Sequence, residues 1–262
     1  MTDEIFRRFE HGGLTVLVHQ YGRAVPGRTQ RAFLLVHGIG ASSRYFARLS
    51  RELAPHGIVY AVDLPGFGSA PTPDAPLGIA GLASLLLTLT GDWGIVDPVL
   101  VGHSMGAQVV LEMAVQDPSL PASVVLLAPV VDPRAPTAFG QCLRLLRDVV
   151  TEPPTANWIV AVDYLRCGPR RYLATLPSML LYRIEARAAR VEAPTLVVRG
   201  ARDPVTPAEW ADRLASAIPD ASRLDVPRAS HVVQHSAAPV VAAAIVAHVE
   251  AAVHQPKPEQ DR

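Results

Sequence analysis

The segment 99–107, Val-Leu-Val-Gly-His-Ser-Met-Gly-Ala, constrains the fold more than any other part of the chain. An apolar run typical of a β-strand leads into Gly-x-Ser-x-Gly, and an apolar stretch with helical spacing follows. This order predicts a tight strand-to-helix turn that lifts Ser104 out of the sheet. Larger side chains at Gly102 and Gly106 would collide with the neighbouring strand and helix. Because the helix directs its first N–H groups toward the serine, we expect a nucleophile here.

Strand-like and helix-like segments alternate along most of the chain. Two strand-like segments flank a His-Gly-Gly turn and predict a hairpin. Later strand-like segments are short and apolar throughout, as in a parallel sheet that is covered on both faces. The expected strands are residues 5–10, 14–21, 32–36, 58–62, 99–101, 123–127, 195–198 and 223–226. The expected helices between them are residues 44–53, 79–89, 107–116, 207–217 and 239–248. The pattern predicts an α/β fold with a doubly wound sheet.

This alternation is interrupted at residues 131–190, which contain no clear strand. Helix-like pieces at 139–150 and 157–165 are separated from other segments by Pro153-Pro154 and Gly168-Pro169. We expect a small helical lid over the carboxyl ends of the strands, where open α/β sheets bind ligands. The expected division is therefore a core at 1–130 and 191–254, a lid at 131–190 and a flexible polar tail at 255–262.

The composition describes a soluble globular protein and excludes several classes of partner. Of the 262 residues, 49% are hydrophobic and the formal net charge is +0, so no field attracts nucleic acid or an anionic membrane. Residues 1–10 lack the apolar stretch of a secretory signal, and no run approaches the ~18–20 apolar residues that span a bilayer. Cys142 and Cys167 form no CxxC pattern and are expected to stay reduced. These features predict a cytoplasmic protein and leave its oligomeric state open.

A serine cannot attack a carbonyl unaided, so it needs a histidine base, and that histidine needs an acid to orient it. Two loops that follow later strands supply candidates, Asp203 and His231. Both lie at strand carboxyl ends, on the same edge of the sheet as Ser104. The chain order Ser, Asp, His is the one expected for this architecture. His235 is the competing base, although it lies further from the strand end.

Four motifs together give the chain a resemblance to the α/β-hydrolase superfamily over nearly its whole length. They are His37-Gly38-Ile39-Gly40, the segment 63–69 (Asp-Leu-Pro-Gly-Phe-Gly-Ser), the serine turn at 99–107, and 194–200 with Asp203 ahead of Ser230-His231. The resemblance implies a mostly parallel eight-stranded sheet with helices on both faces. It also implies an oxyanion hole made by the backbone N–H groups of Ile39 and Met105, and a structural His37. Some members of the superfamily take the acid from the position of Asp132, which therefore stays an alternative to Asp203.

The function expected from these residues is hydrolysis of a small or medium carboxylic ester by a Ser104-His231-Asp203 triad through an acyl-enzyme. A C–C bond hydrolase, a lactonase, a thioesterase or a perhydrolase would use the same triad. A ligand-sensing member of the fold that does not turn over is the alternative from another class.

No metal or organic cofactor is expected, because the chemistry needs none and no clustered Cys/His or paired acidic site is visible. Gly66-Phe67-Gly68 lacks the third glycine of a phosphate loop and is interpreted as a structural turn. The expected partner is a small apolar ester. Within the lid, apolar and aromatic side chains are expected mainly to pack on the core: Phe139, Leu143, Leu146, Trp158, Tyr164, Tyr172 and Met179. Residues 44–46, which follow the oxyanion loop, could reach the mouth of the pocket.

Overall fold

A single eight-stranded sheet forms the centre of the molecule in the computed structural model, which describes residues 4–23, 30–132 and 152–254. The strands are β1 (Glu4–His11), β2 (Leu14–Tyr21), β3 (Ala32–Val36), β4 (Ile58–Asp63), β5 (Val99–His103), β6 (Ser123–Leu127), β7 (Thr195–Gly200) and β8 (Ala221–Val226). Their spatial order is β1-β2-β4-β3-β5-β6-β7-β8. The hairpin β1–β2 joins antiparallel to β4, and all other neighbours are parallel. The fold class expected from the sequence is confirmed.

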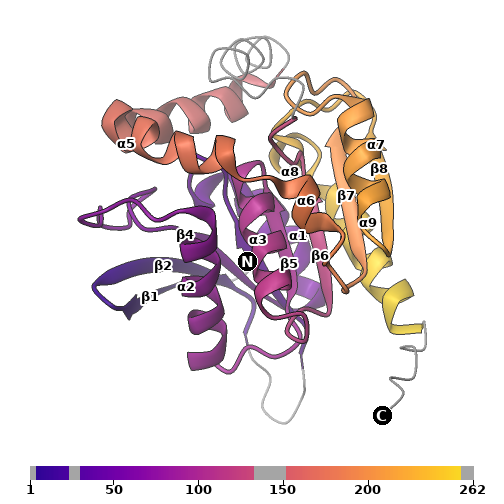
Figure 1. The fold of residues 1–262 in the computed structure, drawn as a ribbon, viewed down its shortest axis with the longest axis horizontal. Coiled ribbons are helices and arrows are strands. Elements are labelled where there is room, and N and C mark those ends of the chain that lie inside the picture. Colours follow the sequence, from indigo (N-terminus) through magenta and orange to yellow (C-terminus); the bar gives the residue numbers. More distant parts are fainter. Residues whose placement is uncertain (1–3, 24–29, 133–151, 255–262) are drawn as a thin grey trace.

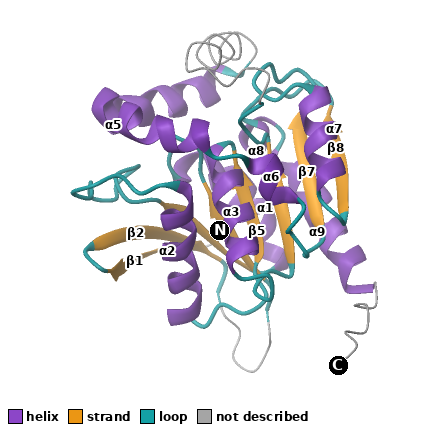
Figure 2. Cartoon of the chain, in the orientation of Figure 1, coloured by secondary structure: helices purple, strands orange, loops and turns teal. Residues whose placement is uncertain are grey.

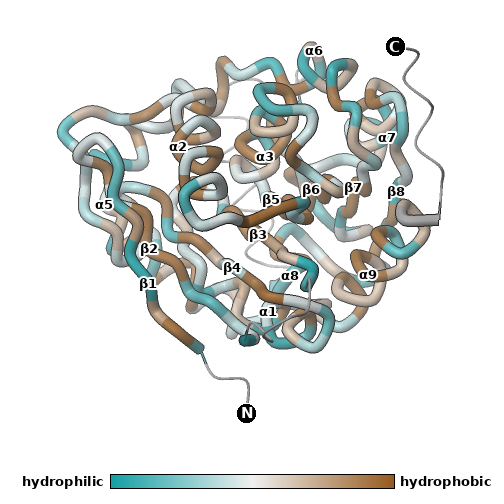
Figure 3. Tube along the Cα trace, turned by 90° about the horizontal axis from the view of Figure 1, so that it is seen from below, coloured by the Kyte–Doolittle hydropathy of each residue, from teal (hydrophilic) through white to brown (hydrophobic). Residues whose placement is uncertain are grey.

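Helices cover both faces of this sheet (Figures 1 and 2). One face carries α2 (Ile79–Asp92), α3 (Met105–Gln116), α6 (Ile184–Ala188) and α7 (Ala208–Ala217). The other carries α1 (Ala47–Leu53), α8 (Val233–Ser236) and α9 (Ala238–His254), with the short turns η1 (Ser43–Phe46) and η2 (Ala54–His56) beside α1. Figure 3 shows the central strands, which are largely brown and therefore apolar, between the layer of α2 and α3 and the layer of α1 and α9.

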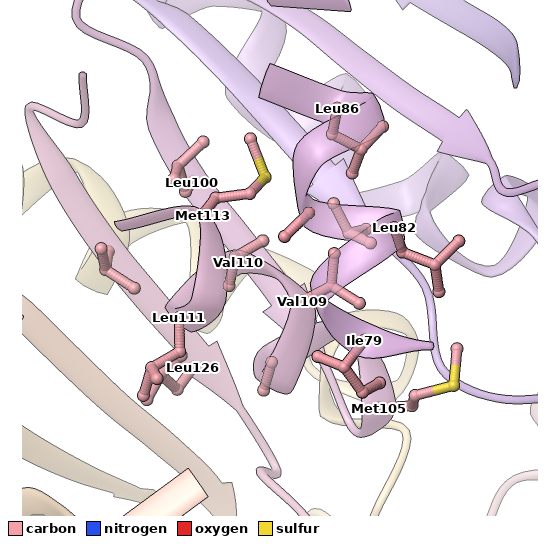
Figure 4. Packing of buried hydrophobic residues seen from close by; sticks show 14 of the residues in the cluster. Ile79, Leu82, Leu86, Leu100, Met105, Val109, Val110, Leu111, Met113 and Leu126 are labelled. Atoms are coloured by element: carbon pink, nitrogen blue, oxygen red, sulfur yellow. The ribbon is translucent and has the colours of Figure 1, made fainter. Parts of the chain in front are cut away.

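The alternation of side chains along each strand divides the interior into two cores. Along β3, Leu34 and Val36 belong to the core under α2 and α3, whereas Phe33 and Leu35 belong to the core under α1 and α9. All four are fully buried, as expected for a central parallel strand. Figure 4 shows the first core, where apolar side chains of α2 and α3 pack against one another and against β5 and β6. This packing makes a rigid base for the loops at the strand ends.

Those loops converge where the strand order reverses. Strand β3 lies between β4, the next strand in the chain, and β5, so the segments after β3 and β5 emerge side by side. Val36 pairs with Gly102, which places residue 37 next to His103. Such a reversal point is where open α/β sheets bind ligands.

The helix α5 (Pro154–Leu181) crosses the same end of the sheet (Figure 1). It is kinked at Gly168, whose φ of 71° is not helical, in agreement with the break expected at Gly168-Pro169. Residues 133–151 of the expected lid lie outside the described residues, so the lid as a domain stays a prediction. None of the helices in the described part of the chain is long and apolar enough to cross a membrane.

Candidate active site

Ser104 occupies the turn between β5 and α3 in a strained backbone conformation. Its φ of 56° and ψ of −119° lie in a region that residues with a side chain rarely adopt. A Cβ on Gly102 would collide with the carbonyl group of Gly106, and a Cβ on Gly106 would collide with that of Val36. The two glycines therefore allow α3 to begin directly against β5 and β3. This is the turn that the sequence predicted.

His231 and Asp203 meet at the ends of β8 and β7. The Nδ1 atom of His231 lies 2.9 Å from Oδ2 of Asp203, and both side chains are buried. The other carboxylate oxygen of Asp203, Oδ1, accepts hydrogen bonds from the N–H groups of Val205 (2.7 Å) and Thr206 (3.0 Å). Burial alone would raise the pKa of Asp203, but the interaction with His231 and the two N–H donors together lower it. An ionised Asp203 holds a proton on Nδ1 of His231 and leaves Nε2 with the lone pair.

A second histidine, His103, packs against His231. Its Nδ1 accepts a hydrogen bond from the hydroxyl of Tyr45 (2.9 Å), and its Nε2 donates one to the carbonyl oxygen of His231 (3.0 Å). The Tyr45 hydroxyl in turn accepts from the N–H of Gly38 (2.7 Å). Complete burial, with a smaller contribution from His231, lowers the pKa of His103 to about 3, so this ring is neutral. The chain of bonds ties the loop after β3 to the backbone of His231.

The predicted oxyanion donors belong to residues next to Ser104 in the chain or in the neighbouring loop. Met105 is the first residue of α3, and its N–H therefore has no carbonyl partner within the helix. Ile39 follows Gly38, where an added Cβ would lie only 2.9 Å from Cβ of Ser104. His37 supports this loop as expected. Its Nδ1 donates a hydrogen bond to the carbonyl oxygen of Gly38 (2.7 Å), and its Nε2 accepts one from the N–H of Leu64 (3.0 Å). The close approach makes Ile39 a near neighbour of the serine.

Two aspartates hold the rest of this loop. Asp63 accepts the N–H of Ser43 (2.7 Å). Asp163, on α5, accepts the hydroxyl of Ser42 (2.6 Å) and the guanidinium of Arg44 (3.0 Å) and is itself 1% exposed. Asp163 could not be recognised from the sequence, because its partner Ser42 is 121 positions away and no local pattern marks either residue. Through these bonds α5 is fastened to the loop that carries Ile39.

A cavity of about 100 Å³ opens at these residues. Ser104 and His231 both line it, and α5 contributes Val160, Tyr164 and Tyr172. The full lining is Gly38, Ile39, Ala41, Tyr45, His103, Ser104, Val130, Asn157, Val160, Tyr164, Tyr172, Met179, Val205, His231 and Val232. Its surface is mostly apolar, so it suits an uncharged, apolar substrate group.

The alternatives considered from the sequence make other contacts. Asp132 accepts a hydrogen bond from Arg213 (2.9 Å) and forms an ion pair with it. His235 is buried in α8, near the hydroxyl of Thr155 at 3.4 Å, and does not line the cavity. Among the expected lid residues, Trp158 does not line this cavity, and Phe139, Leu143, Leu146 and Cys142 lie outside the described residues. Within the described ranges, no group of three or more His, Cys, Asp or Glu side chains could hold a metal ion.

Comparison with known proteins places this geometry in a family. A sequence model of the alpha/beta hydrolase family matches residues 33–244. The chain belongs to this family. The pimeloyl-(acyl-carrier protein) methyl ester esterase of Chromobacterium violaceum is 29% identical over 226 residues, which cover 76% of this chain and 86% of that protein.

Solved structures of other hydrolases share the fold. A thermophilic esterase from Thermogutta terrifontis superposes with a TM-score of 0.77 at 19% identity, covering 95% of this chain and 99% of its own. The 2-hydroxy-6-oxo-6-phenylhexa-2,4-dienoate hydrolase of Rhodococcus sp. strain RHA1 gives a TM-score of 0.78 at 23% identity, covering 95% and 100%. At these identities the likeness establishes the fold, while the substrate has to be argued from the site.

Proposed function

We propose that this alpha/beta hydrolase is a serine esterase that cleaves small or medium carboxylic esters through an acyl-enzyme. The observation that carries the proposal is the position of His231, which lines one apolar cavity together with a strained Ser104 and lies 2.9 Å from the buried carboxylate of Asp203. A histidine that a carboxylate holds in the Nδ1–H tautomer is the base that a serine nucleophile needs.

In the proposed reaction, Oγ of Ser104 attacks the ester carbonyl while Nε2 of His231 takes the serine proton. The charge that develops on the carbonyl oxygen is stabilised by the N–H groups of Ile39 and Met105 and by the positive end of α3. His231 then protonates the leaving alcohol, and the acyl group stays on Ser104. Water, deprotonated by His231, releases the acid and restores the serine.

Steady-state hydrolysis of p-nitrophenyl acetate, butyrate and octanoate tests this proposal. Ser104→Ala should lower turnover by on the order of 10⁴–10⁶. Ser84→Ala is the matched control, since Ser84 is an exposed serine on α2 that only bonds within its own layer, to Ala80 and Gln116. Because the cavity is only about 100 Å³, acetate and butyrate should exceed octanoate in kcat/KM.

The other outcomes point to the alternatives that share the triad. Folded wild-type protein without turnover of any p-nitrophenyl ester would contradict the esterase proposal. Trials with lactones, thioesters and vinylogous 1,5-diketones would then separate a lactonase, a thioesterase and a C–C hydrolase. A single turnover that leaves a lasting adduct on Ser104 would indicate a ligand sensor instead.

A further inference from the structure

A second hollow of about 540 Å³ lies between α1 and the first turns of α5. The side of α5 that faces it carries Pro154, Thr155, Trp158 and Ile159, a different stripe from the one that lines the catalytic cavity. The hollow is completed by residues of η1, α1 and α8: Arg44, Ala47, Arg48, Arg51 and His235. We call this hollow the arginine groove. Its volume falls in the range that small-molecule sites occupy.

The groove carries concentrated positive charge. Arg44, Arg48 and Arg51 are spaced by four and three positions, which puts them on one face of η1 and α1. Arg44 is already paired with Asp163, and Arg48 reaches the carbonyl oxygen of His235 at 3.4 Å. In the described part of the chain, neither Arg48 nor Arg51 forms an ion pair with a carboxylate, and no Asp or Glu lines the groove. Two guanidinium charges are thus available to a ligand.

Beside these charges stands an exposed aromatic surface. Trp158 is 71% exposed, which is unusual for the largest apolar side chain, and Ile159 lies next to it in the groove. An indole face binds aromatic or apolar ligand bodies, and guanidinium groups bind oxyanions through paired N–H donors. Two positive charges match a dianionic phosphoryl group better than a single carboxylate.

We propose that the arginine groove is a binding site for a small organic phosphate, with its phosphoryl group between Arg48 and Arg51 and its apolar body against Trp158. This site is separate from the catalytic cavity and does not involve Ser104 or His231. Binding is therefore independent of the proposed esterase activity, and the Ser104→Ala variant should bind the ligand as wild type does.

Phenyl phosphate is the probe, and the three tryptophans provide the readout. In a ¹⁵N correlation spectrum, the indole N–H of Trp158 should shift on titration, and Trp158→Phe identifies that signal. The signals of Trp93 and Trp210 are internal references. Trp93 packs under Arg7 at 4.0 Å, and Trp210 is buried with its N–H on the carbonyl of Pro129. Titration calorimetry on the full chain gives the Kd.

The charge requirement is tested with a pair of double variants. The double variant Arg48→Gln/Arg51→Gln should weaken phenyl phosphate binding by about tenfold or more, because each of the two substitutions removes one charge-assisted hydrogen bond to the phosphoryl group. Arg183→Gln/Arg190→Gln makes the same charge change on exposed arginines at the two ends of α6 and should leave Kd within about twofold. An equal loss of affinity in both double variants would show that phenyl phosphate is attracted by positive charge anywhere on the protein, and it would overturn the proposal.

Two further ligands test the chemistry. Inorganic phosphate should bind more weakly than phenyl phosphate, because it cannot use Trp158, and benzoate should bind more weakly because it carries one charge. Benzoate binding as tight as phenyl phosphate would overturn the assignment to a phosphoryl group. Failure of phenyl phosphate to move the Trp158 signal at any concentration would overturn the site itself, whatever the esterase assays give.

Discussion

Replacing Asp203 by asparagine should convert His231 into the wrong tautomer while leaving the fold intact. In the structure Oδ1 accepts two backbone N–H groups and Oδ2 faces Nδ1 of His231. An asparagine in the same place keeps its one oxygen toward the two N–H donors and turns its NH₂ group toward His231. The NH₂ then donates to Nδ1, so the histidine proton moves to Nε2 and the ring cannot accept a proton from Ser104.

The size of the effect follows from these bonds. Turning the amide over would lose two hydrogen bonds of about 1 kcal/mol each and leave buried N–H donors unsatisfied. The productive orientation is therefore disfavoured by at least about 2 kcal/mol, or about thirtyfold. In a serine protease that uses the same triad, exchange of the aspartate for asparagine lowers kcat by about 10⁴, which corresponds to about 5 kcal/mol of activation free energy. We expect Asp203→Asn to fall between these limits.

The assay is kcat for p-nitrophenyl butyrate, with thermal unfolding to confirm the fold. Asp132→Asn is the matched control, because Asp132 is equally buried (3% exposed, as is Asp203) but is paired with Arg213. The control should lose stability and keep most of its turnover. Retention of more than a tenth of wild-type activity in folded Asp203→Asn, or an equal loss in Asp132→Asn, would refute the assignment of the acid.

Three further predictions concern the surroundings of the triad. The folded-state pKa of His103 is depressed to about 3, so this residue contributes stability that is present above pH ~6.5 and is lost as pH falls toward 3. In urea unfolding, His103→Gln should therefore lose less stability than wild type between pH 6.5 and pH 4, and parallel losses would contradict this. Asp163→Asn weakens the bonds to Ser42 and Arg44 and should lower kcat for p-nitrophenyl butyrate by about tenfold with little change in KM. An unchanged kcat would show that α5 does not position the oxyanion loop. Met179→Ala enlarges the cavity and should raise kcat/KM for octanoate relative to acetate by about tenfold; a constant ratio would place the acyl group elsewhere.

The parts of the candidate site that could be predicted from the sequence are those governed by local sterics or by strand topology. Gly102 and Gly106 are required by contacts within a few residues, so the turn at Ser104 can be recognised from its own segment. Asp203 and His231 could be proposed because both follow strands whose carboxyl ends share one edge. In each case a general rule about chain geometry links residues without any knowledge of side-chain packing.

The contacts that surround the triad could not be found in this way. The bond from Tyr45 to His103 spans 58 positions, and the bond from His103 to the His231 carbonyl spans 128. Each depends on how helices and loops pack in three dimensions, and a tyrosine or histidine in an apolar segment gives no sign of its partner. The same holds for α5, where the sequence predicted a break at Gly168 but gave no reason to place Asp163 against Ser42.

The two candidate acids differ in the partners that surround them. Asp132 and Asp203 follow the neighbouring strands β6 and β7, so both lie at the correct edge of the sheet. Asp132 gives an oxygen to Arg213, and a carboxylate that is paired with a permanent cation has less charge to offer an imidazolium. Asp203 has one oxygen fixed by the turn that follows it, which aims the other at Nδ1 of His231. The turn at 203–206 therefore holds the carboxylate of Asp203 in place, and its N–H donors help to keep that carboxylate ionised beside His231, which favours Asp203 as the acid of the proposed triad.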